Sequence, residues 1–124
     1  WRVNLDGTRL LLEALRRQSA AGGPVARLVF TSSVAVFGGH LPEIVRDDTV
    51  ATPQLSYGVQ KLMCEYLIAD YARKGYVDGR AVRLPTISVR PGKPNLALSS
   101  FASGVIREPL DGRIHELPVP HDSA

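Results

Sequence analysis

The sequence predicts an α/β fold in which a parallel sheet is covered by helices. Two observations predict it. Along the 124 residues, helical patterns alternate with short apolar runs in the order helix, strand, loop, helix, strand, loop, helix. The apolar run at 25–32 is nearly continuous, which is typical of a strand buried on both faces of a parallel sheet. Such an alternation favours strands joined by crossover helices.

Composition agrees with one folded domain. The chain is 44% hydrophobic and 22% charged, which is ordinary for a globular domain, and its length allows one core but not two. No apolar run is long enough to span a membrane, and the single cysteine, Cys64, excludes an internal disulfide framework. The 15 basic and 12 acidic residues give a net charge of +3. Because the basic residues are scattered among acids, we expect no nucleic-acid partner. We also expect a cytoplasmic protein without a membrane partner.

The first element is a helix over 2–19. Apolar or small residues recur in it at helical spacing and predict one buried face: Val3, Gly7, Leu10, Leu11, Ala14 and Leu15. Glycine inside a helix costs about 1 kcal/mol relative to alanine, so we expect a neighbouring backbone to approach Gly7 closely. Gly22-Gly23-Pro24 ends the helix.

The apolar strand at 25–32 leads into a long loop, 33–54, and loops of this length are usually functional. A second helix is predicted from about Pro53 to Lys74, with Thr52 as its N-cap and Gly75 just after its end. Its apolar residues form a stripe with helical spacing: Val59, Leu62, Met63, Tyr66 and Leu67.

A second strand is predicted over 79–86, where Pro85 ends the pairing. A proline-rich stretch follows, and then a helical pattern near 96–107. The histidines (His40, His115 and His121) share no metal-ligand spacing, so no metal site is expected.

Ligands of open parallel sheets bind beyond the carboxyl ends of the strands. Ser33 follows the first strand, and Tyr57 and Lys61 lie four residues apart at the start of the second helix, where they share a face. A phenol is a weak base at neutral pH, and a nearby ammonium group stabilises its charged form. A serine hydroxyl at the strand end can hold the reacting oxygen of a substrate. The sequence therefore predicts that these three groups converge.

Each of these residues also has a structural interpretation. Ser33 can satisfy the backbone at a strand end. Tyr57 can be a half-buried aromatic residue of a helix, and Lys61 a solvated one. Cys64 is interpreted as a small packing residue.

The motifs resemble those of a known family. Residues 31–38 and Tyr57-Gly58-Val59-Gln60-Lys61 resemble the Ser…Tyr-x-x-x-Lys active site of the short-chain dehydrogenase/reductase superfamily. Residues 4–14 resemble its extended branch, which includes sugar-nucleotide epimerases and dehydratases. Segments 29–33, 84–86, 90–95 and 99–110 are most similar to sugar-acid dehydrogenases of that branch. The resemblance covers nearly the whole chain and implies a Rossmann-like, doubly wound parallel sheet that binds NAD.

The resemblance also implies roles for individual residues. Tyr57 would be the catalytic base, Ser33 would hold the substrate oxygen, and Lys61 would assist Tyr57 and bind the nicotinamide ribose. The implied cofactor-binding residues are Asn4, Ser32, Tyr57, Lys61, Leu84 and Pro85. The implied substrate-binding residues are Ser33, Thr86, Arg90 and Arg107.

For some of these residues a structural role, or another residue in the same role, is an alternative. Asn4 can be a helix-start residue, and Thr86 can simply end a strand. Arg107 suits a substrate carboxylate, but it equally suits the C-terminal end of a helix. Arg90 and Lys93 compete for the same carboxylate.

At the level of the whole chain, the resemblance assigns 1–95 to the C-terminal half of an NAD-binding domain and 96–124 to the start of a smaller substrate-binding region. The Gly-rich βαβ unit is expected before Asn4, so the chain by itself is expected to be inactive. The expected function is NAD-dependent oxidation of a hydroxyl group in a small sugar acid, by a homodimer formed through the helices at 2–19 and 53–74. The alternatives are a nucleotide-sugar epimerase or dehydratase and a non-catalytic, NAD-sensing protein of the same fold.

Overall fold

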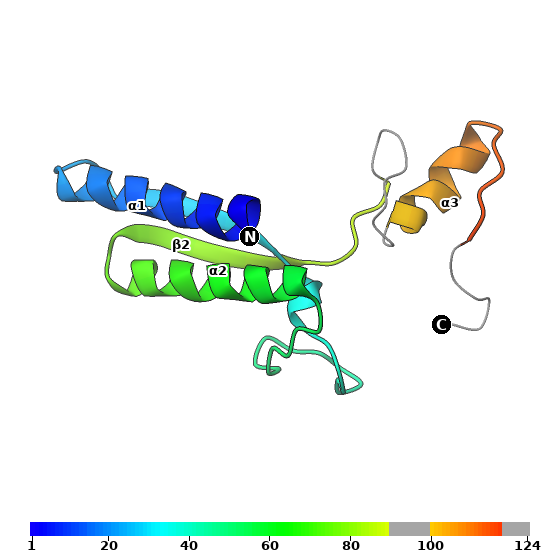
Figure 1. Cartoon of the computed structure of the whole chain (residues 1–124), viewed down its shortest axis with the longest axis horizontal. Coiled ribbons are helices and arrows are strands. Elements are labelled where there is room, and N and C mark those ends of the chain that lie inside the picture. The colour runs from blue at the N-terminus through cyan, green and yellow to red at the C-terminus, as the bar shows by residue number, and fades with distance from the viewer. Residues whose placement is uncertain (90–99, 118–124) are drawn as a thin grey trace. The chain divides into compact units, whose positions relative to one another are not determined.

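The computed structural model describes residues 1–89 and 100–117, which belong to two compact units, Trp1–Leu84 and Pro85–Ala124 (Figure 1). The elements of the first unit are, in order, η1 (Arg2–Asp6), α1 (Gly7–Ala20), β1 (Ala26–Ser33), η2 (Val34–Val36), α2 (Ser56–Arg73) and β2 (Val77–Leu84). The second unit contains α3 (Phe101–Leu110). The domain boundary expected near residue 95 lies outside the described residues, so the domain assignment stays a prediction.

β1 and β2 form a parallel pair that runs from Ala26 opposite Val77 to Ser33 opposite Leu84. The expected α/β fold with a parallel sheet is therefore confirmed. The connection between parallel neighbours has to cross from one end of the sheet to the other, and α2 makes this crossing. As a result, both strands end at the same edge of the sheet, which is the edge that positions the candidate site.

The core lies between the sheet and both helices. Leu12 of α1, Ile68 of α2 and Val77 of β2 are buried together, and Leu28 and Phe30 of β1 pack against them. Because one face of β1 supplies these contacts, α1 and α2 cover the same face of the sheet. The two helices also contact each other.

The opposite face of the sheet is open to solvent in the described chain. Val29 of β1 is 68% exposed and Val82 of β2 is 45% exposed. Burial along β1 alternates from residue to residue, so the expectation of a strand buried on both faces was wrong for this chain. The physical reason is that both neighbouring helices pack on one side, and no described segment covers the other.

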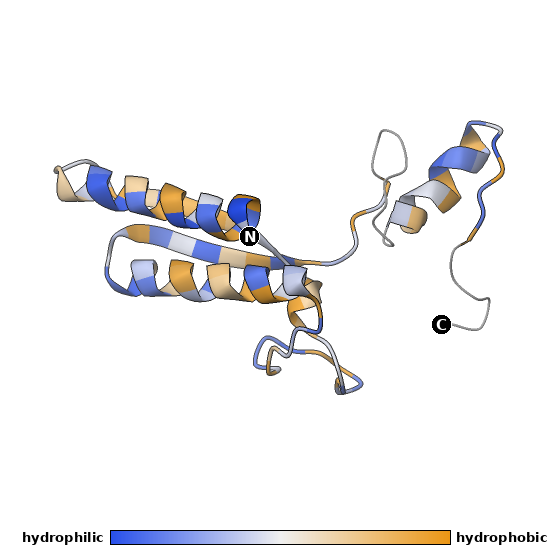
Figure 2. Cartoon of the chain, in the orientation of Figure 1, coloured by the Kyte–Doolittle hydropathy of each residue, from blue (hydrophilic) through white to orange (hydrophobic). Residues whose placement is uncertain are grey.

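The apolar face predicted for the helix over 2–19 is buried only in part, since Leu15 packs against the core. Val3 is 87% exposed and Leu10 is 60% exposed, whereas Leu12 is fully buried. The expected close approach at Gly7 is absent, because a Cβ there would lie 3.8 Å from the Arg2 carbonyl oxygen, an ordinary contact. Apolar residues are distributed along both helices (Figure 2), and on α1 several of them point away from the core.

The predicted stripe of α2 is also buried only in part, since Leu67 packs against the core. Met63 is 39% exposed and Tyr66 is 68% exposed. The residues of this helix that are buried are Gly58, Gln60, Cys64 and Ile68. The interpretation of Cys64 as a packing residue agrees with its complete burial.

The start of α2 lies later than predicted. The helix begins at Ser56 with Leu55 as N-cap, and no side chain caps it. Thr52 is not the N-cap, because its hydroxyl donates instead to the Gly38 carbonyl at 2.7 Å. Gly75 follows the helix with φ +74°, a conformation that glycine adopts readily, so this stop signal is confirmed.

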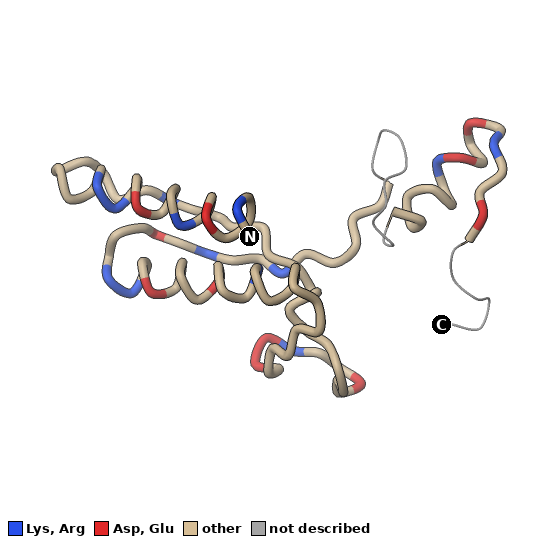
Figure 3. Tube along the Cα trace, viewed as in Figure 1, with Lys and Arg blue, Asp and Glu red and all other residues tan. Residues whose placement is uncertain are grey.

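Charges of both signs are interspersed along α1 and α2, and the described part of the chain carries no continuous basic stripe (Figure 3). Among the described residues, no helix is long and apolar enough to cross a membrane. Within 1–89 and 100–117, no group of three His, Cys, Asp or Glu residues could hold a metal ion.

Candidate active site

Ser33 is the last residue of β1 and the N-cap of η2. Its Oγ accepts a hydrogen bond from the Ala35 amide at 3.2 Å. The strand-end role that competed with catalysis is therefore present. It uses an acceptor position of the hydroxyl and leaves the hydroxyl proton for another partner.

Gly58 lets the segment after Ser33 lie directly against the helix that carries Tyr57. A Cβ at position 58 would lie 2.0 Å from the Ala35 carbonyl oxygen and 3.1 Å from Pro53 Cβ. Only a residue without a side chain fits this contact. The approach brings the turn that follows β1 to the first turn of α2.

Lys61 ties α2 to the end of β1. Its Nζ donates to the Thr31 carbonyl at 2.7 Å. The same nitrogen lies 4.6 Å from the centre of the Phe30 ring and 5.7 Å from the centre of the Tyr57 ring. The structure thus places the ammonium group beside Tyr57, as the four-residue spacing predicts. Tyr57 is 45% exposed, so a small molecule can reach it.

Asn4 lies in η1 and contacts α2 beside Lys61. Its Nδ2 donates to Gln60 Oε1 at 3.2 Å, and Gln60 is buried. Its carbonyl accepts from the Thr8 hydroxyl at 2.6 Å and from the Cys64 thiol at 3.5 Å. Asn4 is therefore held inside the first unit, and its predicted cofactor role stays a prediction.

The Ser32 hydroxyl is engaged inside the first unit. The side chain is buried, and Oγ donates to Glu65 of α2. Glu65 in turn pairs with Arg83 of β2 at 2.8 Å, and this pairing raises the pKa of the Arg83 guanidinium. The predicted cofactor contact of Ser32 would therefore have to come from its backbone or from a rearranged hydroxyl.

The remaining predicted residues lie at the end of β2 and in the second unit. Leu84 is half-buried and lies opposite Ser33 in the sheet register. Pro85 and Thr86 are exposed and belong to the second unit. Arg90 lies outside the described residues.

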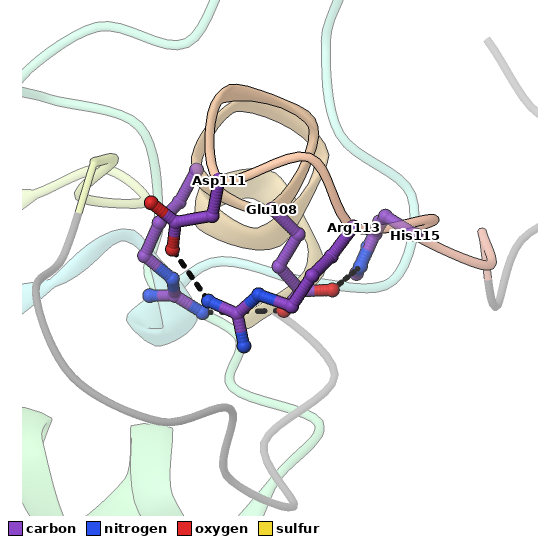
Figure 4. A network of polar contacts seen from close by, with 5 residues as sticks. Glu108, Asp111, Arg113 and His115 are labelled. Carbon is purple, nitrogen blue, oxygen red and sulfur yellow. Dashed lines mark hydrogen bonds and ion pairs between the residues drawn. The ribbon is translucent and has the colours of Figure 1, made fainter.

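Arg107 contacts Glu108 at the end of α3, and Figure 4 shows Glu108 with Asp111, Arg113 and His115. Arg107 Nη2 lies 3.4 Å from Glu108 Oε1, and Glu108 Oε2 lies 2.8 Å from His115 Nδ1. His115, and to a smaller extent Arg107, lowers the pKa of the buried Glu108 carboxyl. Asp111 and Arg113 form a further ion pair beside them. This part of the structure therefore gives Arg107 a partner in its own unit.

Sequence reasoning missed Glu65, Arg83 and Gln60. The available signals were weak: Glu65 follows Lys61 by one helical turn, and Arg83 is one of three charged residues in β2, beside Asp78 and Arg80. The Glu108–His115 pair was also missed, because contacts across a turn leave no regular spacing in the sequence.

Comparison with known proteins identifies the family. The model of the NAD dependent epimerase/dehydratase family matches residues 1–123. The chain is 62% identical over 118 residues to D-erythronate dehydrogenase of Cupriavidus necator, covering 95% of this chain and 35% of that protein. It is 52% identical over 122 residues to D-erythronate dehydrogenase of Haemophilus influenzae, covering 98% and 38% respectively.

Solved structures agree on the fold. The chain matches a nucleoside-diphosphate-sugar epimerase from Agrobacterium tumefaciens with a TM-score of 0.89 and 53% identity, over 97% of this chain and 35% of that one. It matches L-threonine dehydrogenase from Phytophthora infestans with a TM-score of 0.72 and 31% identity, over 88% and 34%. The expected Rossmann-like fold is confirmed.

The chain spans little more than a third of the length of the curated relatives that it matches. The family expected from the motifs at Asn4, Ser33 and Tyr57–Lys61 is nevertheless matched over almost the entire chain. The chain therefore belongs to the NAD dependent epimerase/dehydratase family.

Proposed function

We propose that the protein containing this chain oxidises a hydroxyl group of a small, four-carbon sugar acid, with NAD as the hydride acceptor. The observation that carries the proposal is the position of Lys61, whose ammonium group is bound to the end of β1 and lies beside the Tyr57 ring. The similarity to two proteins named D-erythronate dehydrogenase supports the choice of substrate class.

The donor groups of the site fit a nicotinamide cofactor. The Lys61 ammonium group lies 5.7 Å from the centre of the Tyr57 ring, at the carboxyl edge of a parallel sheet, where nucleotide cofactors bind in such folds. The Tyr57 hydroxyl and the Lys61 ammonium group can both donate hydrogen bonds to ribose hydroxyls. When bound, NAD supplies the acceptor for the hydride.

The chain's own residues orient the substrate and move its proton. Ser33, whose acceptor side is occupied by the Ala35 amide, donates a hydrogen bond to the reacting oxygen and keeps its own proton. Tyr57 takes the proton of that oxygen as general base, and the nearby charge of Lys61 stabilises the phenolate that abstracts it. The carbon that carried the hydroxyl loses a hydride, so the alcohol becomes a carbonyl.

A sugar-acid substrate also needs a partner for its carboxylate. Arginine binds carboxylates through two parallel hydrogen bonds, so we assign this contact to Arg107 or Arg90, and the family resemblance assigns a substrate contact to Thr86. Asn4, Leu84 and Pro85 complete the proposed cofactor contacts. These assignments are part of the proposal.

An epimerase is the second candidate, because the similar structure from Agrobacterium tumefaciens is named a nucleoside-diphosphate-sugar epimerase. The same three groups serve a transient oxidation equally well. The substrates differ in chemistry, since a sugar acid carries one carboxylate and a nucleotide sugar carries a diphosphate.

The experiment is a substrate screen with the full-length protein. Four-carbon sugar acids, L-threonine and nucleotide sugars are each offered with NAD, and the absorbance of the reduced cofactor is followed. We expect stoichiometric NADH formation with a sugar acid. Epimerised nucleotide sugar without net NADH would favour the second candidate, and no turnover of any sugar acid would contradict the proposal.

Self-association is a further part of the proposal. We propose a cytoplasmic homodimer that meets through α1 and α2. The apolar side chains exposed on these helices support it, namely Leu10 (60%), Leu11 (48%), Met63 (39%) and Tyr66 (68%). A second copy of the same surface would remove them from water.

A further inference from the structure

Glu65 joins the ends of both strands to the helix that carries Tyr57 and Lys61. Its carboxylate accepts a hydrogen bond from Ser32 Oγ. Arg83 binds the same carboxylate through Nη2 at 2.8 Å and through Nε at 3.2 Å from each oxygen. The side chains of Glu65 and Arg83 are only 12% and 28% exposed. Partly buried, bidentate ion pairs between arginine and a carboxylate keep a more fixed geometry than solvent-exposed ion pairs.

The two residues that bind Glu65 lie opposite each other in the sheet. Ser32 of β1 is the register partner of Arg83 of β2. One carboxylate from α2 therefore fixes both strands one residue before they end. Ser33 is the next residue after this fixed position.

The same network holds the turn that Ser33 begins. The Arg83 guanidinium lies over the Phe37 ring, 4.8 Å from its centre, and Phe37 is the C-cap of η2. Ser33 is the N-cap at the other end of η2. Both ends of this short turn are thus connected to Glu65.

Lys61 is attached to the same structure. It precedes Glu65 by one helical turn, so the two side chains share a face of α2. Lys61 Nζ donates to the Thr31 carbonyl, and Thr31 directly precedes Ser32. A shift of α2 against β1 would therefore move Lys61 and the strand end relative to each other.

We propose that Glu65 is a positioning residue, which holds Ser33 and Lys61 in place around Tyr57 through its contacts with Ser32 and Arg83. The inference rests on the proposed function of these three residues. Glu65 itself takes no proton from the substrate. Its contribution is geometric, because misplacing reacting groups by about 1 Å can cost about a hundredfold in rate.

The test uses the full-length enzyme with Glu65→Gln, which keeps the shape of the side chain and removes its charge. We expect kcat per NAD-binding site to fall by about ten- to a hundredfold, with little change in the Kd for NAD. Asp70→Asn is the matched control. Asp70 lies on the same helix and pairs with Arg73 and Lys74 at the surface. The kcat of Asp70→Asn should therefore equal that of the wild type. A lower Tm with unchanged kcat per site in Glu65→Gln would overturn the proposal.

A double variant separates positioning from stability. Replacing a buried ion pair by apolar residues of similar volume often preserves stability, so Glu65→Leu with Arg83→Met restores folding if Glu65→Gln is unstable. We expect kcat to stay low while Tm recovers. Recovery of both quantities together would show that the pair serves stability alone and would refute the positioning role.

The proposed function and this inference can fail separately. If the wild-type enzyme oxidises no sugar acid, the proposed function fails. Crystal structures of the wild type and of Glu65→Gln then decide the inference. A displacement of Ser33 Oγ or Lys61 Nζ relative to Tyr57 Oη supports it, and unchanged positions of these atoms overturn it.

Discussion

Gly58 is the residue at which the fold and the candidate site depend most directly on each other. The Ala35 carbonyl lies where a side chain at position 58 would begin, since a Cβ there would be 2.0 Å from its oxygen and 2.8 Å from its carbon. Backbone atoms cannot move aside as a flexible side chain can. Any larger residue has to separate η2, which follows Ser33, from the turn of α2 that carries Tyr57.

We expect Gly58→Ala to lower stability by about 1–3 kcal/mol, the usual cost of forcing extra volume into a packed site. The activity of the full-length protein should fall with it, because Ser33 and Tyr57 are moved apart. Chemical denaturation and steady-state kinetics measure the two effects.

Gly7→Ala is the matched control for this substitution. Gly7 has a helical backbone with φ −59°, and a Cβ there meets only an ordinary contact at 3.8 Å. This variant should be more stable by about 0.5–1 kcal/mol and fully active. Equal effects of the two substitutions would contradict the role given to Gly58.

Residue types were enough to select Ser33, Tyr57 and Lys61, because a hydroxyl, a phenol and an amine at these spacings suggest that a tyrosine removes the proton of a substrate hydroxyl. They were not enough to find Glu65. Its contacts depend on the register that places Ser32 opposite Arg83, and the alignment of two strands separated by a helix cannot be read from local sequence.

At the scale of single elements, α1 carries a local ion-pair group. Glu13 Oε1 lies 2.6 Å from Arg16 Nη2 and 3.1 Å from Arg17 Nε. These hydrogen bonds, that of Arg16 above all, lower the pKa of Glu13 from 4.5 to about 2. Because the folded value is the lower one, the stabilisation is present above pH 4.5 and is lost as the pH falls from 4.5 toward 2.

An NMR titration of the Glu13 carboxyl group should therefore give a midpoint of about 2. Arg16→Gln should move the midpoint up toward 4.5, since the largest cause of the shift is removed. Arg113→Gln, in the second unit, should leave it unchanged. An ordinary midpoint in the unmodified protein would show that these contacts do not form in solution.

The order and type of the elements could be predicted, and their ends less well. β1 begins and ends one residue later than predicted, and β2 runs over Val77–Leu84 instead of 79–86. The start of α2 was missed because Thr52 bonds to Gly38, fourteen residues away. A capping residue that is engaged by a distant partner looks the same in the sequence as one that is free.

At the scale of the whole molecule, the apolar patterns predict which residues are buried, but they do not predict which segment covers those residues. The faces expected to be buried at Val3, Leu10 and Val29 are open in this chain. Hydrophobic spacing cannot distinguish a face covered within the chain from one covered by another segment or subunit. The chain spans little more than a third of the length of its curated relatives.

The proposed homodimer gives a prediction at this scale. Leu10→Glu places a charge on the exposed apolar face of α1, and loss of one buried leucine costs about 1.5–3 kcal/mol. We expect the dissociation constant of the full-length dimer to rise at least about tenfold, as measured by sedimentation equilibrium.

Gln18→Glu adds the same charge to α1 at an exposed polar position and should leave the dimer intact. A monomeric wild-type protein, or equal dissociation of both variants, would speak against an interface formed by these helices.

The central claim is that Tyr57 removes the proton of the substrate hydroxyl, and kcat of Tyr57→Phe in the full-length enzyme tests it most directly. Tyr66→Phe is the matched control, since it removes a hydroxyl from the same helix at a position that is 68% exposed. We expect kcat of Tyr57→Phe to fall by about 10²–10⁴-fold, the usual contribution of a general base. Its affinity for NAD should change by no more than a few-fold, and Tyr66→Phe should stay fully active. Dehydrogenation by Tyr57→Phe at the wild-type rate would contradict the account.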